Sequence, residues 1–586
     1  MHNRKHSLRF SYVFLFLIFC LIIFAVRLVL VQVFRSSYLT RLAKKQHNYF
    51  IELEAKRGTI YDRNLRPVAL NVAVYSLYAK PIMMGQKDKE KAIHALSTLL
   101  HRDPSYLRNR LSRKKYFMWL ARKLPLELAD KIKAMEINGL DFVIETKRYY
   151  PNQTLAAHLI GFAGIDNEGL DGLELYYNKY LKGKSGWSQI LRDARQRALL
   201  IEQDFIPPRD GFNLVLTIDE TIQYIAERAL EKAFEEHNAK AASIIVLNPR
   251  TGEILALANR PTYNLEDFSA TPPENRTNRA IQYTYEPGSV FKIVTAAAAL
   301  EEAVAGEDDK FFCENGSYRI ANHVLHDHHP HGTLTFKEIF EQSSNIGVAK
   351  IAQRLGAQRV YNYARRFRFG MKTQINCPGE VSGVLKSPAS WSKTTIGAIP
   401  MGHEVTVTSL QLVCAIAAVA NDGVYMRPFV VKYIKDNQDE LIKEFKPTIM
   451  DQVITPETAR RLKAILQGVV ENGTGKRAKI EGIAAAGKTG TAQKVIDGVY
   501  SHGRFYASFF GFAPVEDPRV AVVVVFDEPH PSYFGGTVAA PVFQEVVQDT
   551  LKYLQVSGEE KLNTSQVIKR EKQTMKRNDE SSALAD

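Results

Sequence analysis

Cysteine is scarce in this chain, which has four cysteines in 586 residues. Cys20 lies within a long apolar run, and Cys313, Cys377 and Cys414 show no C-x-x-C spacing. The sequence therefore argues against a thiolate zinc site of the ribbon or finger type, and it requires no disulfide framework. One disulfide, between Cys313 and Cys377, is compatible with the sequence, which does not test their separation.

The chain also lacks a nucleic-acid-binding motif, although its formal net charge is +14. Such an excess of positive charge suits nucleic acid, an anionic membrane or an acidic polymer as a partner. Much of it is spread along residues 102–133, where it fits a solvated helical face. We therefore expect no nucleic-acid partner.

One segment lacks charge altogether. Residues 10–26 read FSYVFLFLIFCLIIFAV and continue past Arg27 through LVLVQVF, which is long enough to cross a bilayer as a helix. The run has no small-residue cleavage site, so we interpret residues 10–34 as a permanent anchor and not as a signal peptide. Basic residues flank both ends, and the positive-inside rule does not decide the orientation. A short tail at 1–9 and a large C-terminal part favour a single span with a cytoplasmic tail and its bulk across the membrane.

The length predicts two or three domains. We expect a pedestal of mixed helices and strands at 35–211, ending in the turn-rich segment Pro207 to Gly211. A second domain should occupy 212–556, and the charged, serine-rich tail at 557–586 should be disordered.

Local patterns predict the elements within these domains. The predicted strands lie within 57–81 and at 213–219, 243–248, 253–259, 506–514 and 519–529. The predicted helices are a basic neck at 39–48, then 87–100, 125–135, 291–303 and 409–421, and a last helix starting near Pro541. Strands at both ends of the second domain enclose helices, which indicates an antiparallel sheet with a helical subdomain.

Three serines are followed three positions later by a lysine, a spacing at which the amine can reach the hydroxyl on one helix face. The pairs are Ser112 with Lys115, Ser289 with Lys292, and Ser390 with Lys393. Only Ser289 follows a Pro-Gly turn, in YEPGS, and leads into an alanine-rich helical stretch. At a helix N-terminus the dipole and the free N–H groups favour an oxyanion and lower the pKa of a lysine. We therefore predict Ser289 as a nucleophile and Lys292 as its activating base.

Two later motifs complete an acyl-transfer site. Ser343 and Asn345, in SSN, can pass a proton to a leaving amine. Lys488 opens KTGT, and the small, strand-like residues before it would let an extended peptide dock along a strand edge. The motifs S-x-x-K, S-x-N and K-T-G in this order form a specific signature.

The KTGT segment has the residue types of a carboxylate clamp. Gly490 would let a substrate backbone approach closely, while Lys488, Thr489 and Thr491 suit a carboxylate. Taken singly, each motif has a simpler interpretation. S-x-x-K can be a helix start with a solvated lysine, S-x-N an ordinary helix cap, and K-T-G a bare turn. Their coincidence favours function.

The motifs resemble those of class B penicillin-binding proteins, and the resemblance covers nearly the whole chain. It includes RGTIYDRN, GIDNEGLDGLE at 164–174 and VTSLQLVCAIAAVANDG at 407–423. YEPGS and SSNIG look more like the septal, FtsI-type enzymes than the elongation type. The resemblance implies an α+β fold with a single transmembrane helix and an elongated mixed α/β pedestal or dimerisation domain. The transpeptidase domain would have an antiparallel sheet flanked by helices, with an all-helical subdomain.

The resemblance also implies a peptidoglycan D,D-transpeptidase that cross-links stem peptides ending in D-Ala-D-Ala. Ser289 would form an acyl-enzyme with release of D-alanine, and β-lactams would acylate the same serine. Backbone N–H groups of Ser289 and Thr491 would form the oxyanion hole. Ser343 would pass the proton, and Lys488, Thr489 and Thr491 would hold the terminal carboxylate. A carboxypeptidase side reaction is compatible with this chemistry, and no cofactor is implied.

A histidine-rich segment precedes SSN and invites a zinc hypothesis. Its histidines are His323, His326, His328, His329 and His331. They have no accompanying cysteine or defined ligand spacing, and family members carry a similar D-x-H-x-x-G loop, so we expect no metal.

The resemblance places the catalytic part outside the cytoplasmic membrane. A multi-span SEDS polymerase of FtsW type and other divisome proteins would be partners, because the region before Ser289 lacks the acidic motif of glycosyltransferases. Three alternatives stay open: an elongation-type transpeptidase, a β-lactam sensor and a structural divisome component. A sensor usually carries several spans and an H-E-x-x-H motif, and this chain has neither. Intact catalytic motifs argue against a purely structural role, and the anchor argues against a secreted β-lactamase.

Overall fold

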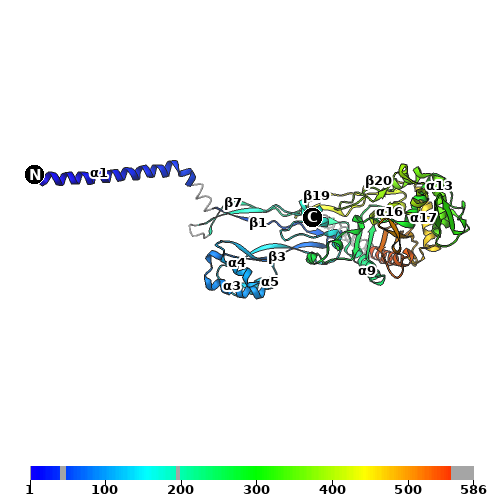
Figure 1. Ribbon diagram of the computed structural model, residues 1–586, viewed down its shortest axis with the longest axis horizontal. Helices are drawn as coiled ribbons and strands as arrows, with labels where there is room; N and C mark the ends of the chain where they lie inside the picture. The colour runs from blue at the N-terminus through cyan, green and yellow to red at the C-terminus, as the bar shows by residue number, and fades with distance from the viewer. Residues whose placement is uncertain (1, 40–47, 193–197, 556–586) are drawn as a thin grey trace, which may run out of the picture. The chain divides into compact units, whose positions relative to one another are not determined.

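The computed structural model describes residues 2–39, 48–192 and 198–555 (Figure 1). The chain divides into two compact units, Met1–Lys56 with Gly183–Gly211, and Arg57–Lys182 with Phe212–Asp586. The predicted domain limits at 35–211 and 212–556 stay predictions. The predicted tail at 557–586 lies outside the described residues.

The first unit holds the apolar helix and a small sheet. Helix α1 (His2–Val29) continues through the π-helical turn η1 (Leu30–Phe34). The segment Tyr12–Phe34 is long and apolar enough to cross a membrane. Strands β1 (Asn48–Leu53), β6 (Gly186–Arg192) and β7 (Ala198–Ile206) form an antiparallel sheet in the order β1-β6-β7. Most of the predicted neck at 39–48 lies outside the described residues.

The second unit begins with a sheet whose longest strand is β3. The sheet has seven strands: β2 (Ile60–Tyr61), β3 (Pro67–Ala79), β4 (Met118–Leu124), β5 (Leu140–Tyr149), β8 (Asn213–Leu216), β18 (Val431–Lys435) and β19 (Leu441–Glu444). Its order is β19-β18-β8-β2-β3-β4, with β5 also paired to β3. Residues from three distant parts of the sequence therefore share this sheet.

Three helices cover one part of this sheet: α3 (Gln86–Leu99), α4 (Pro104–Ser112) and α5 (Leu126–Lys133). Their apolar faces bury Ile93, Leu96 and Leu107 against Leu77 of β3. The predicted helices at 87–100 and 125–135 are confirmed. Pro125, expected in the first helical turn, is the N-cap residue instead.

Glu174 is completely buried between two arginines. Its carboxylate accepts from Arg57 Nε and from Arg148 Nε, each at 2.6 Å. Arg57 also donates to the Glu174 carbonyl, and Arg148 donates to the Gly58 carbonyl at 2.8 Å. Arg148 lies on β5, Arg57 precedes β2, and Glu174 lies on the short helix α7 (Gly172–Tyr176). The Glu174 carboxylate therefore connects these three segments.

Glu174→Gln is expected to destabilise the protein strongly, because it leaves two buried guanidinium groups without a counter-charge. Breaking a buried pair costs about 3–5 kcal/mol. The apparent Tm of the purified full-length protein measures the effect. The control Glu90→Gln removes half of the exposed pair with Arg108, which should cost at most about 1 kcal/mol. Equal Tm values for the two variants would contradict the importance of this cluster.

The five-stranded sheet of the second unit has the order β10-β9-β23-β22-β21. Its strands are β9 (Ala241–Leu247), β10 (Ile254–Arg260), β21 (Ala486–Ile496), β22 (Val499–Ala513) and β23 (Val520–Asp527), and every pair is antiparallel. The predicted β9–β10 hairpin and the adjacency of β22 and β23 are confirmed. β21 lies at the edge of the sheet.

Both faces of this sheet are buried, which explains why β9, β10 and β23 read as continuous apolar runs. Helix α9 (Glu220–Glu236) and the helix at 535–555 pack on the face that carries Ile244 and Val524. Helix α16 (Ser409–Ala420) packs on the face that carries Ile245 and Val523. The last helix begins at 535, six positions before the predicted start, and Pro541 lies inside it.

The remaining long helices form a group around α11 (Lys292–Glu301), which packs against α13 (Asn345–Leu355), α14 (Ala357–Arg366) and α17 (Pro456–Glu471). Helix α12 (Phe336–Glu341) packs against α17 and α13. The short helices of this unit are α6 (Ala157–Ile160), α8 (Asn178–Leu181), α10 (Arg279–Gln282) and α15 (Thr395–Ala398). Four short antiparallel ribbons join them: β11 (Lys310–Phe312) with β14 (Thr333–Thr335), β12 (Ser317–Ile320) with β13 (His323–His326), β15 (Val384–Leu385) with β16 (Val405–Thr406), and β17 (Val424–Met426) with β20 (Ile449–Gln452). The helical subdomain is thus present, with ribbons that the sequence analysis did not predict.

Candidate active site

Ser289 lies in a single 3₁₀ turn, Gly288–Phe291, that runs directly into α11. The Lys292 N–H donates to the Ser289 carbonyl, so the serine is one turn before the lysine. Ser289 is partly exposed, whereas Lys292 is completely buried. The prediction of a helix N-terminus at Ser289 is confirmed, with a tighter first turn than expected.

The Lys292 amine is held by the SSN motif. Nζ donates to the Ser343 carbonyl at 2.6 Å and to Asn345 Oδ1 at 2.8 Å, and it lies 3.2 Å from Ser343 Oγ. Burial lowers the pKa of Lys292 to about 7, and the negative charge of Asp327 opposes this shift. Near neutral pH a large fraction of this amine is therefore unprotonated and able to accept a proton.

Ser343 adopts a backbone conformation that non-glycine residues seldom take, with φ of 60°. This conformation lets both its carbonyl and its hydroxyl meet Lys292. Ser344, not Ser343, is the N-cap of α13, because its hydroxyl accepts from the Gly347 N–H at 2.9 Å. The simpler interpretation of Ser343 as a helix cap is therefore wrong.

Lys488 reaches the same hydroxyl from β21. Its Nζ donates to Ser343 Oγ at 2.9 Å, so Ser343 lies between two buried lysine amines. Burial, and secondarily the positive charge of Lys292, hold the pKa of Lys488 well below its usual range. A bound anion would restore the charge of Lys488, because an opposite charge favours the ammonium form.

The two threonines of KTGT are held in place by neighbouring segments. Thr489 Oγ1 lies 2.8 Å from Thr474 Oγ1. Thr491 Oγ1 accepts from the N–H of Gly535, at the start of the last helix, at 3.2 Å. The Thr491 hydroxyl proton is then free to turn toward a ligand.

Glycines bring the Ser289 turn against β21. A Cβ on Gly288 would lie 2.8 Å from the Thr491 carbonyl oxygen, and one on Gly490 would lie 3.0 Å from the Pro287 carbonyl oxygen. A Cβ on Gly490 would also clash with Ser508 Oγ on the neighbouring strand, so the close packing of β21 against the turn and β22 already requires a glycine there. The two residues predicted for the oxyanion hole, Ser289 and Thr491, lie on these adjoining segments. Their role stays a prediction, as does a substrate contact at Gly490.

Gly288→Ala is expected to slow acylation by penicillin at least about tenfold, because the added Cβ meets a backbone atom and Gly288 has a φ of 61°. The rate of labelling by a fluorescent penicillin measures the loss. Gly306→Ala is the control, since a Cβ there has no neighbour within 4 Å. Unchanged labelling of Gly288→Ala would show that the turn tolerates displacement from β21.

Sequence reasoning missed two acidic residues of the site. Asp327 accepts from the backbone N–H of Asn345 at 2.6 Å. Glu286, counted only as part of a turn, accepts from the Glu404 N–H and from Tyr500, and lies 2.8 Å from His403 Nδ1. The only signal for Glu286 was its place in YEPGS, and the signal for Asp327 was the D-x-H spacing before SSN.

Other predicted features take no part in the site. The hydroxyls of Ser112 and Ser390 donate to nearby carbonyls, and Lys115 and Lys393 are exposed. Within residues 2–39, 48–192 and 198–555, no three His, Cys, Asp or Glu side chains gather as metal ligands. The disulfide between Cys313 and Cys377 is not formed, and both are buried free thiols.

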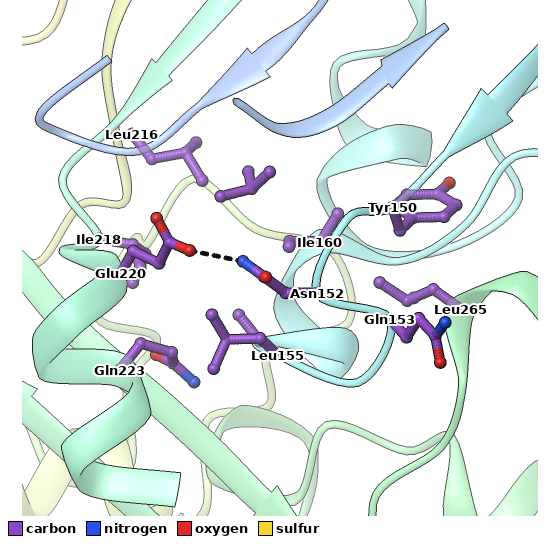
Figure 2. A pocket seen from close by; sticks show the side chains of 12 residues that line it. Tyr150, Asn152, Gln153, Leu155, Ile160, Leu216, Ile218, Glu220, Gln223 and Leu265 are labelled. Atoms are coloured by element: carbon purple, nitrogen blue, oxygen red, sulfur yellow. Dashed lines mark hydrogen bonds between the residues drawn. The ribbon is translucent and has the colours of Figure 1, made fainter. Parts of the chain in front are cut away.

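A small cavity lies elsewhere in the second unit, beside the start of α9 (Figure 2). Apolar side chains such as Leu216, Ile218 and Leu265 line it, and Asn152 donates to Glu220 at 2.7 Å across it. None of the residues of the three motifs contributes to its lining. We interpret it as a packing gap.

Comparison with known proteins identifies the family. Residues 242–548 match the penicillin binding protein transpeptidase domain, and residues 52–216 match the penicillin-binding protein dimerisation domain. The chain is 35% identical to stage V sporulation protein D of Bacillus subtilis, over 94% of this chain and 86% of that protein. It is 32% identical to the peptidoglycan D,D-transpeptidase FtsI of Escherichia coli, over 86% and 85%.

A solved structure agrees with these matches. Penicillin binding protein 3 of Mycobacterium tuberculosis, complexed with ampicillin, superposes with a TM-score of 0.68 at 26% identity, over 86% of this chain and 97% of that one. Two family domains in this order, preceded by one apolar helix, match the organisation deduced from the motifs. The chain belongs to the class B penicillin-binding proteins.

Proposed function

We propose that the protein is a serine D,D-transpeptidase that cross-links the peptide stems of peptidoglycan. The observation that carries this proposal is the buried Lys292 amine, one turn after Ser289 and hydrogen-bonded to Ser343 and Asn345. Matched relatives are named peptidoglycan D,D-transpeptidases, which supports the same chemistry here.

Acylation begins when the neutral Lys292 amine takes the proton of the Ser289 hydroxyl. Oγ attacks the carbonyl of the penultimate D-alanine, and the oxyanion is stabilised by the N–H groups of Ser289 and Thr491. The peptide bond then breaks. The proton passes from Lys292 through Ser343 to the nitrogen of the departing D-alanine, a path for which the contact at 3.2 Å is suitable.

The terminal carboxylate of the donor peptide binds beside Lys488, with the hydroxyls of Thr489 and Thr491. The carboxylate raises the pKa of Lys488 and so creates the ammonium group that binds it. The peptide lies along β21, because an edge strand offers unpaired N–H and C=O groups to an added strand.

Deacylation completes the cross-link. An amine from a neighbouring stem attacks the Ser289 ester, loses a proton to the Lys292 and Ser343 pair, and releases the serine hydroxyl. Water in place of the amine would give a carboxypeptidase side reaction. A β-lactam enters the same sequence and stops at the acyl-enzyme.

Location and partners follow from the anchor and the family. The Tyr12–Phe34 helix would hold the protein in the cytoplasmic membrane, with residues 1–9 inside and the catalytic part outside. Its likeness to FtsI supports a place at the division septum. The absence of a polymerase motif before Ser289 supports a separate glycan polymerase, of the multi-span FtsW type, as its partner.

Products of the reaction test the proposal. Full-length protein should convert uncross-linked glycan strands bearing pentapeptide stems into cross-linked dimers, with one D-alanine released per link. Mass spectrometry measures both products, and penicillin should suppress both. Release of D-alanine without dimers would contradict transpeptidation, and formation of neither product would contradict the proposal as a whole.

A further inference from the structure

Asp327 lies in the loop between β13 and β14, and its carboxylate accepts hydrogen bonds from the first residues of α13 and from its N-cap. Oδ1 accepts from the N–H groups of Asn345 at 2.6 Å and Ile346 at 3.0 Å. Oδ2 accepts from the hydroxyl of Ser344 at 2.7 Å. One carboxylate therefore binds three consecutive residues, the last two of SSN and the one after it.

The same loop also holds the side chain of Asn345. Its Nδ2 donates to the His326 carbonyl at 3.0 Å, while its Oδ1 accepts from Lys292 Nζ. The loop thus fixes Asn345 at both its backbone and its amide. A displaced loop would move the acceptors of the Lys292 amine, including the Ser343 carbonyl on the adjoining turn.

Among the residues that the structure describes, two ionisable side chains act on Lys292. Asp327 faces it from this loop and Lys488 faces it from β21, whereas α13 presents the neutral Asn345. Asp327 is the negative charge that offsets part of the burial cost of the Lys292 ammonium. Its carboxylate also opposes the positive end of the α13 dipole.

We propose that Asp327 is a positioning residue of the acylation reaction. It holds Asn345 and the Ser343 turn against Lys292, and its negative charge stabilises the ammonium that forms when Lys292 takes the Ser289 proton. The inference rests on the proposed function, since it assigns Asp327 a part in the reaction of Ser289.

The test measures the rate of acylation by a fluorescent penicillin between about pH 5 and 9, in the full-length protein and three variants. In Asp327→Asn the ammonium loses its counter-charge, so Lys292 becomes neutral at lower pH. The acid limb of the profile is the fall in acylation rate as Lys292 becomes protonated at low pH. In Asp327→Asn this fall should occur at a pH about one unit lower. Asp327→Glu keeps the charge and should keep the limb near its original position. Asp327→Ala loses the cap and the charge, and should lower the rate about tenfold at its optimum, with the limb also shifted.

A matched control uses the neighbouring helix α12. Glu338, like Asp327, is a carboxylate that accepts from a backbone N–H at a helix N-terminus, but its partner is Thr335 in the capping box of α12 and not a residue that binds Lys292. Glu338→Gln should leave the acid limb unchanged. A shift as large as that of Asp327→Asn would overturn the proposal, as would a limb that stays in place in Asp327→Asn.

The outcomes separate this inference from the proposed function. A wild-type protein that is not acylated would contradict the function itself. A wild-type protein that is acylated with an acid limb, together with an unmoved limb in Asp327→Asn, would overturn only the role of Asp327. If Asp327→Ala fails to fold by its Tm, the Asn and Glu variants still decide, because both retain an oxygen that accepts from Asn345.

Discussion

Ser289→Ala is expected to abolish covalent labelling by fluorescent penicillin, with a loss on the order of 10³-fold or more. The substitution removes the only atom that forms the ester. Ser343 lies close to both buried lysines, but its backbone is held in a strained conformation and its hydroxyl already lies between the two amines. We therefore expect no replacement nucleophile. Gel fluorescence and mass spectrometry of the intact protein measure the adduct.

The chain supplies its own controls for this substitution. Ser112→Ala and Ser390→Ala remove serines with the same lysine spacing, whose hydroxyls donate only to nearby carbonyls. Both variants should label like the wild type. An adduct retained in Ser289→Ala, or lost in Ser390→Ala, would contradict the assignment of the nucleophile.

The elements around Ser289 could be predicted because their signals are local. A Pro-Gly turn before an alanine-rich run predicts a helix start, and the runs that became β22 and β23 are apolar enough to be buried on both faces. The predicted start of the last helix near Pro541 was wrong. Proline is common at the first position of a helix, where its missing N–H costs nothing, and this preference carried the prediction. In the structure Pro541 lies in the second turn of the helix at 535–555, so the packing of the whole helix decides where it starts.

The pairing of strands that lie far apart in the sequence could not be predicted from local patterns. The sheet that joins β2, β3, β8 and β18 brings Ile60 beside Leu214, and Leu214 beside Ile434. Each strand alone predicts only that it is half-buried, and nothing in its own pattern specifies the partner strand. Whether Cys313 and Cys377 pair could not be predicted for the same reason. A disulfide requires the two cysteines to lie close together in the folded chain, and the structure has both as free thiols.

Within the site, the sequence predicted the groups to which we assign the chemistry, and it missed two acidic residues that bind backbone N–H groups beside them. Lys292, Ser343 and Lys488 could be proposed from the sequence because each belongs to a short motif, and the three motifs occur in an order that is specific to this enzyme class. Asp327 and Glu286 act through backbone N–H groups of Asn345 and Glu404, and an acidic residue in a loop has many other uses. The left-handed backbone of Ser343 is likewise imposed by its surroundings and leaves no sequence signal.

Lys292→Met is the second substitution for which we expect a loss of orders of magnitude, roughly 10²- to 10⁴-fold in acylation rate. Methionine fills a similar volume in the buried site but has no amine to take the Ser289 proton. Lys350→Met is the matched control, because this lysine lies on α13 and pairs with Glu314 and the Phe312 carbonyl instead. Its acylation rate should stay within about threefold of wild type.

The pH dependence of the wild type tests the same role. Burial lowers the pKa of Lys292 to about 7, so the amine is mostly neutral above that pH and mostly protonated below it. Acylation should therefore decline as the pH falls through about 7, by up to tenfold per pH unit, and should level off above it. This decline should be absent in Lys292→Met, because the variant has lost the base that titrates. The slow acylation that remains should therefore not fall with pH near 7.

These two measurements distinguish a base from a merely structural lysine. A structural role predicts a lower Tm in Lys292→Met and a pH profile of unchanged shape at reduced amplitude. A base predicts a folded protein whose slow acylation has lost its acid limb, while Lys350→Met keeps both rate and limb. Acylation of Lys292→Met within tenfold of wild type would exclude the lysine as the base. Ser289 would then need another proton acceptor, and Lys488, which also donates to Ser343 Oγ, would be the group to substitute next.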